Sequence, residues 1–201
     1  IVEVIEEETE VVALEEGGEE GSETRDLAAE KETFLTTLEK DGYAEVGAYK
    51  VELVPGRTNV YHMDEEIKAL KGGTVDEDGN MHNPSSIYFV VEDDAVLMVD
   101  GGNPVSGEAE IDAKVIVEAM TAGKAVTLIY THSHSDHTGL GGSTAVFENV
   151  NVTKAYAGAP DVEEISTVDT QHTITGLNDG ETFTVAGKTY TVNIVKSHTE
   201  G

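Results

Sequence analysis

The sequence contains no cysteine and no tryptophan, and only 12 of its 201 residues are basic, against 40 acidic ones. The absence of cysteine excludes disulfides and thiolate metal ligands. The formal net charge of -28 argues against attraction to nucleic acid or anionic membranes and disfavours polyanionic substrates. No apolar run approaches the roughly 20 residues that span a bilayer, and no signal-peptide pattern opens the chain.

The acidity of the chain fits a saline habitat or the surface of a cell. An extracellular or cell-surface location is therefore favoured over a cytoplasmic one. The length suits a single domain with an appendage.

The appendage is predicted at the N-terminus. Residues 1–24 hold ten glutamates and no basic residue, with an apolar run at 11–14 that indicates a strand or a docking contact. Residues 26–40 carry apolar side chains at helical spacing before Gly42. Core packing explains such a helix, and partner binding is the alternative. We therefore divide the chain into an acidic arm and amphipathic helix (1–42) and a domain (43–201).

The central part of the chain predicts an α/β fold. Strands are expected at residues 43–54, 58–63, 86–91, 95–99 and 125–130, and a helix at residues 107–122. Helix 107–122 joins two strands as a β-α-β crossover. Residues 64–84 form a polar insertion with a short helix at 65–71. Farther on, short helices are expected at 143–148 and 161–165, and strands at 150–155, 171–175, 181–185 and 188–195.

Three of the seven histidines fall within six positions, directly after the strand at 125–130. In an extended backbone His132, His134 and Asp136 face one spot, whereas His137 needs the chain to turn. Imidazole and carboxylate are ligands of hydrolytic zinc sites, and the carboxyl end of a strand is where open α/β sheets place their sites. The sequence therefore predicts a site for one or two metal ions.

The remaining histidines at 62, 82 and 172 are isolated among ordinary neighbours, which indicates surface or packed side chains rather than ligands. Tyr130, directly before the cluster, is predicted to be a core residue.

The spacing His-x-His-x-Asp-His at residues 132–137 resembles the signature of the metallo-β-lactamase superfamily, whose members are mostly zinc-dependent hydrolases. Residues 95–102 are similar to that family's strand with an Asp-x-Gly turn, and residues 192–201 to its strand with a His-Thr-x-Gly loop. The resemblance implies an αβ/βα sandwich, of which this chain holds the N-terminal part and the start of the second half.

The ligands that this resemblance implies are His132, His134 and His198 for a first zinc ion, and Asp136 and His137 for a second. It also implies that Asp100 supports the ligands from behind and that Asp136 orients the nucleophile. Other divalent metals remain open in place of zinc.

The family supplies a further aspartate and histidine, which would lie beyond Gly201, so we expect a partner chain or a C-terminal segment to complete the site. The implied reaction is attack by a metal-bound hydroxide on an ester, thioester, lactam or related bond of a small-molecule substrate. The alternative is a non-catalytic cell-surface binding protein that keeps the fold and uses its acidic arm for interaction.

The charge of the chain generates a first prediction. Because so few cations are present to displace counterions from phosphates, the protein should show no appreciable affinity for duplex DNA or RNA at physiological salt. A binding titration at low and moderate salt measures this. Submicromolar, salt-sensitive binding would contradict it.

Overall fold

The computed structural model describes residues 25–65, 85–196 and 199. Within them, the mixed sheet has the order β1 (Tyr43–Val46), β2 (Tyr49–Leu53), β3 (Val60–Glu65), β4 (Ser86–Val91), β5 (Ala95–Val99), β6 (Ala125–Tyr130), β7 (Val152–Gly158) and β8 (Ile174–Leu177). A separate hairpin pairs β9 (Thr182–Val185) with β10 (Lys188–Thr191). The helices are α1 (Leu27–Asp41), α2 (Gly107–Thr121), α3 (Ser135–Thr138) and α4 (Val162–Val168), with 3-10 turns η2 (Gly139–Gly142) and η3 (Ala159–Asp161).

The large sheet changes direction at β5. Strands β1 to β5 pair antiparallel, whereas β5 to β8 pair parallel. Helix α2 makes the crossover between β5 and β6, which places Val99 beside Ile129 at the ends of these two strands. The predicted α/β class and β-α-β crossover are confirmed. None of the helices in the described part of the chain has the length and apolar character that crossing a membrane requires.

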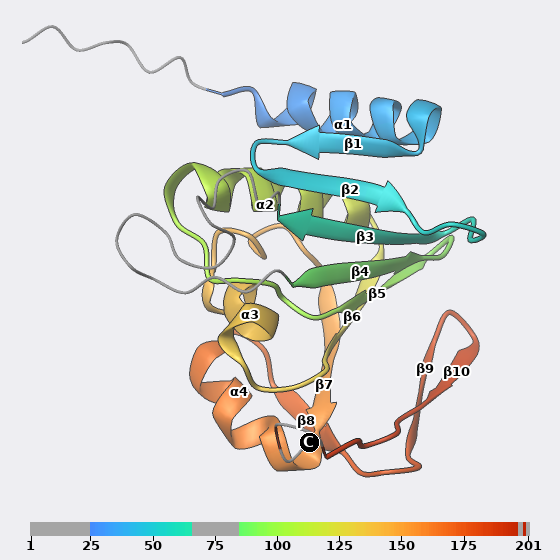
Figure 1. The fold of residues 1–201 in the computed structure, drawn as a ribbon, viewed down its shortest axis with the longest axis vertical. Helices are drawn as coiled ribbons and strands as arrows, with labels where there is room; N and C mark the ends of the chain where they lie inside the picture. Colours follow the sequence, from blue (N-terminus) through green and yellow to red (C-terminus); the bar gives the residue numbers. More distant parts are fainter. Residues whose placement is uncertain (1–24, 66–84, 197–198, 200–201) are drawn as a thin grey trace, which may run out of the picture.

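Side chains of β5 alternate between two packed faces of the sheet. Val96 and Met98 belong to the main core, which also takes in buried residues of α1, α2 and α4. Ala95 and Leu97 instead pack with Phe183 of the β9–β10 hairpin. Figure 1 accordingly shows α4 and this hairpin on opposite sides of the lower half of the sheet. Both faces of β5 are covered, which explains its uninterrupted apolar sequence.

Strands β4, β5 and β6 have the predicted bounds, and α2 ends one residue before the predicted end. The single strand predicted at 43–54 is wrong, because the chain reverses at Gly47 (φ 55°) and forms β1 and β2. The helix predicted at 143–148 is also wrong. Its backbone forms turns in which Glu148 and Val150 donate to carbonyls three residues back.

Four further strands begin later than predicted, β3 at Val60, β7 at Val152, β8 at Ile174 and β9 at Thr182, and the strand predicted at 188–195 ends early, at Thr191. The shift of β8 has a local cause, because the Asp169 carboxylate accepts the N–H groups of Gln171 and His172 and holds these residues out of the sheet. Strand β3 includes residues 64 and 65, which were assigned to the insertion. The contact predicted at 11–14 and the rest of the insertion lie outside the described residues.

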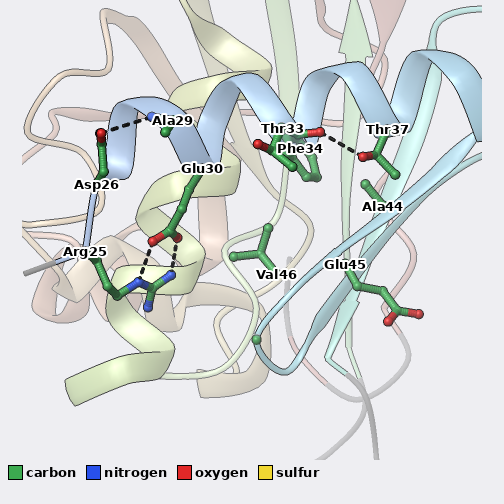
Figure 2. Close-up of a pocket in the computed structure, with 11 residues that line it drawn as sticks. Arg25, Asp26, Ala29, Glu30, Thr33, Phe34, Thr37, Ala44, Glu45 and Val46 are labelled. Carbon is green, nitrogen blue, oxygen red and sulfur yellow. Dashed lines mark hydrogen bonds and ion pairs between the residues drawn. The ribbon is translucent and has the colours of Figure 1, made fainter. Parts of the chain in front are cut away.

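Helix α1 packs on the core, which agrees with the core-packing interpretation of its apolar face. Asp26 caps its first turn by accepting from the N–H groups of Ala28 and Ala29, and Phe34 and Leu38 are buried. A cavity of about 420 Å³ lies between α1 and β1. Figure 2 shows the residues that line it, among them Arg25 bonded to Glu30. No residue of the histidine cluster lines this cavity.

A buried carboxylate joins α1 to α2. Glu118 of α2 accepts from Lys31 at 2.8 Å, from Lys114 at 2.6 Å and from the amide of Asn149 at 2.8 Å. Burial raises the pKa of Glu118, but the hydrogen bonds from Lys114, Lys31 and Asn149 outweigh burial, so its pKa lies below the usual range. Its charge therefore stabilises the folded chain.

Glu118→Gln should destabilise the protein by about 1–3 kcal/mol at pH 7, because it removes charge-assisted hydrogen bonds. The carboxylate's contribution is complete above its unfolded pKa of about 4.3 and is lost as the pH falls through its lower folded pKa. The difference between variant and wild type should therefore shrink below pH 4 in urea titrations. Glu148→Gln is the control, because Glu148 is 67% exposed and contacts the same Lys114. Equal losses in both variants would contradict the account.

Candidate metal centre

The histidine cluster lies on the loop that follows β6, beside the loop that follows β5. Three backbone hydrogen bonds join the loops, from Gly101 N–H to the His137 carbonyl (2.6 Å), from Gly139 to Gly102 (2.8 Å) and from Leu140 to Gly101 (2.8 Å). A Cβ atom at Gly139 would lie 2.0 Å from the backbone nitrogen of Pro104. Only glycine therefore permits this approach of the two loops.

The chain turns earlier in the cluster than predicted. Asp136 was expected in an extended segment with His132 and His134, but α3 begins at Ser135 and holds both Asp136 and His137. The helix forms there because the His134 carbonyl accepts the N–H of His137 at 3.0 Å. His132 and His134 remain in the extended part, and their rings lie edge to face with centroids 4.9 Å apart.

The Asp100 carboxylate connects the two loops. Asp100 is buried and has a φ of 66°, a left-handed conformation that is uncommon for residues other than glycine, asparagine and aspartate. It accepts from the N–H of Thr131 at 2.7 Å, from the Thr131 hydroxyl at 2.8 and 3.0 Å, and from Nδ1 of His137 at 2.8 Å. In this backbone conformation one carboxylate contacts both the start and the middle of the loop at residues 131–142, which we call the histidine loop.

These contacts define which nitrogen of each ring carries its hydrogen. A carboxylate only accepts, so Nδ1 of His137 donates to Asp100, and Nε2 of the neutral ring holds the lone pair. The single hydroxyl hydrogen of Thr131 points to Asp100, so Thr131 Oγ1 accepts from Nδ1 of His132, 3.1 Å away. Nε2 of the neutral His132 ring then also holds a lone pair. Both rings have the form in which Nε2 can bind a metal.

The donor spacing in α3 fits a metal ion. Nε2 of His137 lies 3.5 Å from Oδ2 of Asp136. Two ligands of a tetrahedral zinc with bonds of about 2.0–2.1 Å are roughly 3.3 Å apart, so these atoms are spaced for one shared metal. Among the described residues no three His, Asp or Glu side chains are grouped to hold a metal. The predicted third histidine, His198, lies outside those residues.

The pKa of His137 is raised by its hydrogen bond to Asp100. Burial opposes this increase, and the charges of Asp100 and Asp136 add to it. His137 is therefore surrounded by carboxylates, which favour a positive charge at this position, whether proton or metal.

Predictions were also made for Tyr130 and for the three histidines outside the cluster. Tyr130 is buried, as predicted. His62 pairs with Asp64, and His172 pairs with Asp169, so both have packed or paired roles. His82 lies outside the described residues. Thr131 was not predicted as a site residue, although its position directly before His132 at the end of a strand was a usable signal.

A cavity of about 350 Å³ borders the site. It lies between the large sheet and the β9–β10 hairpin, and most of its lining is apolar. Thr131 is the one residue of the loop 131–142 that lines it.

The family model of the metallo-beta-lactamase superfamily matches residues 81–201, more than half of the chain. No protein of curated function matches.

Solved structures similar to the chain include a metallo-β-lactamase from Erythrobacter litoralis, with 18% identity and a TM-score of 0.43. The match covers 62% of this chain and 48% of that one. FIM-1 from Pseudomonas aeruginosa, in its mono-zinc form, has 16% identity and a TM-score of 0.44, with coverages of 68% and 55%. The chain thus spans about half the length of these structures. On the match to the family model, the chain belongs to the metallo-β-lactamase superfamily.

Proposed function

We propose that the protein is a zinc-dependent hydrolase of a small-molecule ester, thioester, lactam or related bond. The observation that carries the proposal is the pair of donor atoms in α3, His137 Nε2 and Asp136 Oδ2, at 3.5 Å, with the far side of the imidazole held by Asp100. A carboxylate bonded to Nδ1 leaves Nε2 of the neutral ring available as a donor to a metal.

The residues that would hold zinc are His132, His134 and His198, with Asp136 and His137 for a second ion. Bound zinc would lower the pKa of water to roughly 7 and polarise the bond to be cleaved. Asp136, whose side chain is 14% exposed, would accept a hydrogen from the attacking water and orient it. Asp100 would keep His132 and His137 in the required form.

The substrate would be small and partly apolar. The cavity beside Thr131 has a volume within the range of small-molecule pockets, roughly 300–1,000 Å³, and an apolar lining. The net charge of -28 disfavours polyanions.

The first test is metal content. Purified protein should retain about one zinc per chain through the three histidines, and His134→Ala should lose most of it in elemental analysis. His62→Ala is the control, because His62 is bonded to Asp64 on β3, away from the loop. Metal-loaded protein should hydrolyse members of an ester, thioester and lactam panel, and chelation should stop this. Unchanged zinc in His134→Ala would refute the site, whereas bound zinc without hydrolysis would favour a binding protein.

Asp100→Asn should weaken zinc binding by about 10–100-fold, the usual effect of removing a group that orients a ligand. Asparagine tolerates the positive φ at this position, so the backbone should survive the change. Competition with a chromophoric chelator measures the affinity. Asp100→Gly keeps the backbone freedom without any side chain, and it should bind as weakly as Asp100→Asn. Wild-type affinity in either variant would contradict the role given to the carboxylate.

A further inference from the structure

The residue just before the histidine loop is anchored to a distant part of the chain. Tyr130 ends β6 and is 1% exposed. Its hydroxyl donates to Oδ2 of Asp169 at 2.7 Å, and Asp169 is equally buried where α4 ends. Burial, together with the charge of Asp169, raises the pKa of Tyr130. The phenol therefore stays protonated and remains a donor.

Asp169 is itself held in place by its own partners. Its Oδ1 accepts from the N–H groups of Gln171 and His172, both at 3.1 Å, and Nδ1 of His172 lies 2.8 Å from Oδ2. Burial raises the pKa of Asp169, but the hydrogen bonds from His172 and Tyr130 outweigh it and lower the pKa. A carboxylate with so many partners is a rigid acceptor for the Tyr130 hydroxyl.

The same group of residues also contacts the far end of the loop. A Cβ atom at Gly141 would lie 2.5 Å from the Tyr130 hydroxyl and 2.8 Å from Cβ of Asp169. The side-chain amide of Gln171 donates to the Gly141 carbonyl at 2.9 Å. Asp169, together with the neighbouring Gln171, therefore contacts the loop at both ends. The contact before the histidines is with Tyr130, and the contact after them is with Gly141.

We propose that Asp169 is a positioning residue for the histidine loop (131–142). It acts through Tyr130 and Gly141, without touching metal or substrate. Asp100 fixes the loop from the β5 side, and Asp169 fixes it from the α4 side. The loop between these two carboxylates carries His132, His134, Asp136 and His137, so its ends are set before a ligand arrives. The consequence for metal affinity rests on the proposed function, whereas the ordering of the loop does not.

The test compares Tyr130→Phe and Asp169→Asn with Tyr156→Phe. Tyr130→Phe removes only the hydroxyl, and Asp169→Asn keeps the shape of the side chain. Tyr156 lies on neighbouring β7 but packs against Phe183 on the other face of the sheet, so its variant is a matched control.

Amide hydrogen exchange of the metal-free proteins is the first measurement. Residues 131–142 should exchange about tenfold faster in Tyr130→Phe and Asp169→Asn, with α2 unchanged, because the loop is released locally. The control should match wild type. Unchanged exchange in the loop, or an equal increase throughout the chain, would overturn the proposal. If Asp169→Asn does not fold, Tyr130→Phe decides alone.

Cobalt(II) titration followed by visible spectroscopy is the second measurement. Tyr130→Phe should bind cobalt about tenfold more weakly than wild type, with an altered absorption band, at a temperature at which both proteins are fully folded. Wild-type affinity and spectrum in this variant would overturn the link to the metal. Absence of binding in the wild type would refute the proposed function, and hydrogen exchange would still decide whether Asp169 positions the loop.

Discussion

The hydrogen bonds accepted by the Asp100 carboxylate are the interaction on which the arrangement of the histidine loop, residues 131–142, depends. Asp100 is buried at the end of β5 in a left-handed backbone conformation, and it meets both Thr131 and His137. A buried carboxylate is unfavourable unless it is fully bonded. Satisfying it fixes the start of the loop, the orientation of one imidazole and, through the Thr131 hydroxyl, the hydrogen position on a second.

The backbone of the sheet brings Asp100 close to the loop that follows β6. Parallel pairing of β5 and β6 brings two loops to the same edge, and α2 supplies the crossover that parallel pairing requires. Gly139 then lets the backbones meet, since any side chain there would overlap the Asn103–Pro104 peptide. The contact between the two loops thus depends on the fold, and the positions of the donor atoms of His137 and Asp136 depend on that contact.

Much of this could be predicted from residues close together in the chain. The apolar strands β5 and β6, the amphipathic α2 and the histidine spacing are local patterns, and the first three appear with almost the predicted bounds. The errors arose at turns, whose hydrogen bonds and backbone angles are not visible in the periodicity of the side chains. Gly47 turned one strand into two, and Asp169 delayed β8. The anchoring of Tyr130 by a carboxylate 39 residues away has no signal in the sequence at all.

The central claim is that Asp100 sets the hydrogen positions of His132 and His137. Nitrogen-15 NMR of the histidine side chains in metal-free protein, recorded at a pH above the raised pKa of His137, measures this directly. The account predicts that both rings carry their hydrogen on Nδ1 and hold a lone pair on Nε2. A hydrogen on Nε2 of either ring would contradict it.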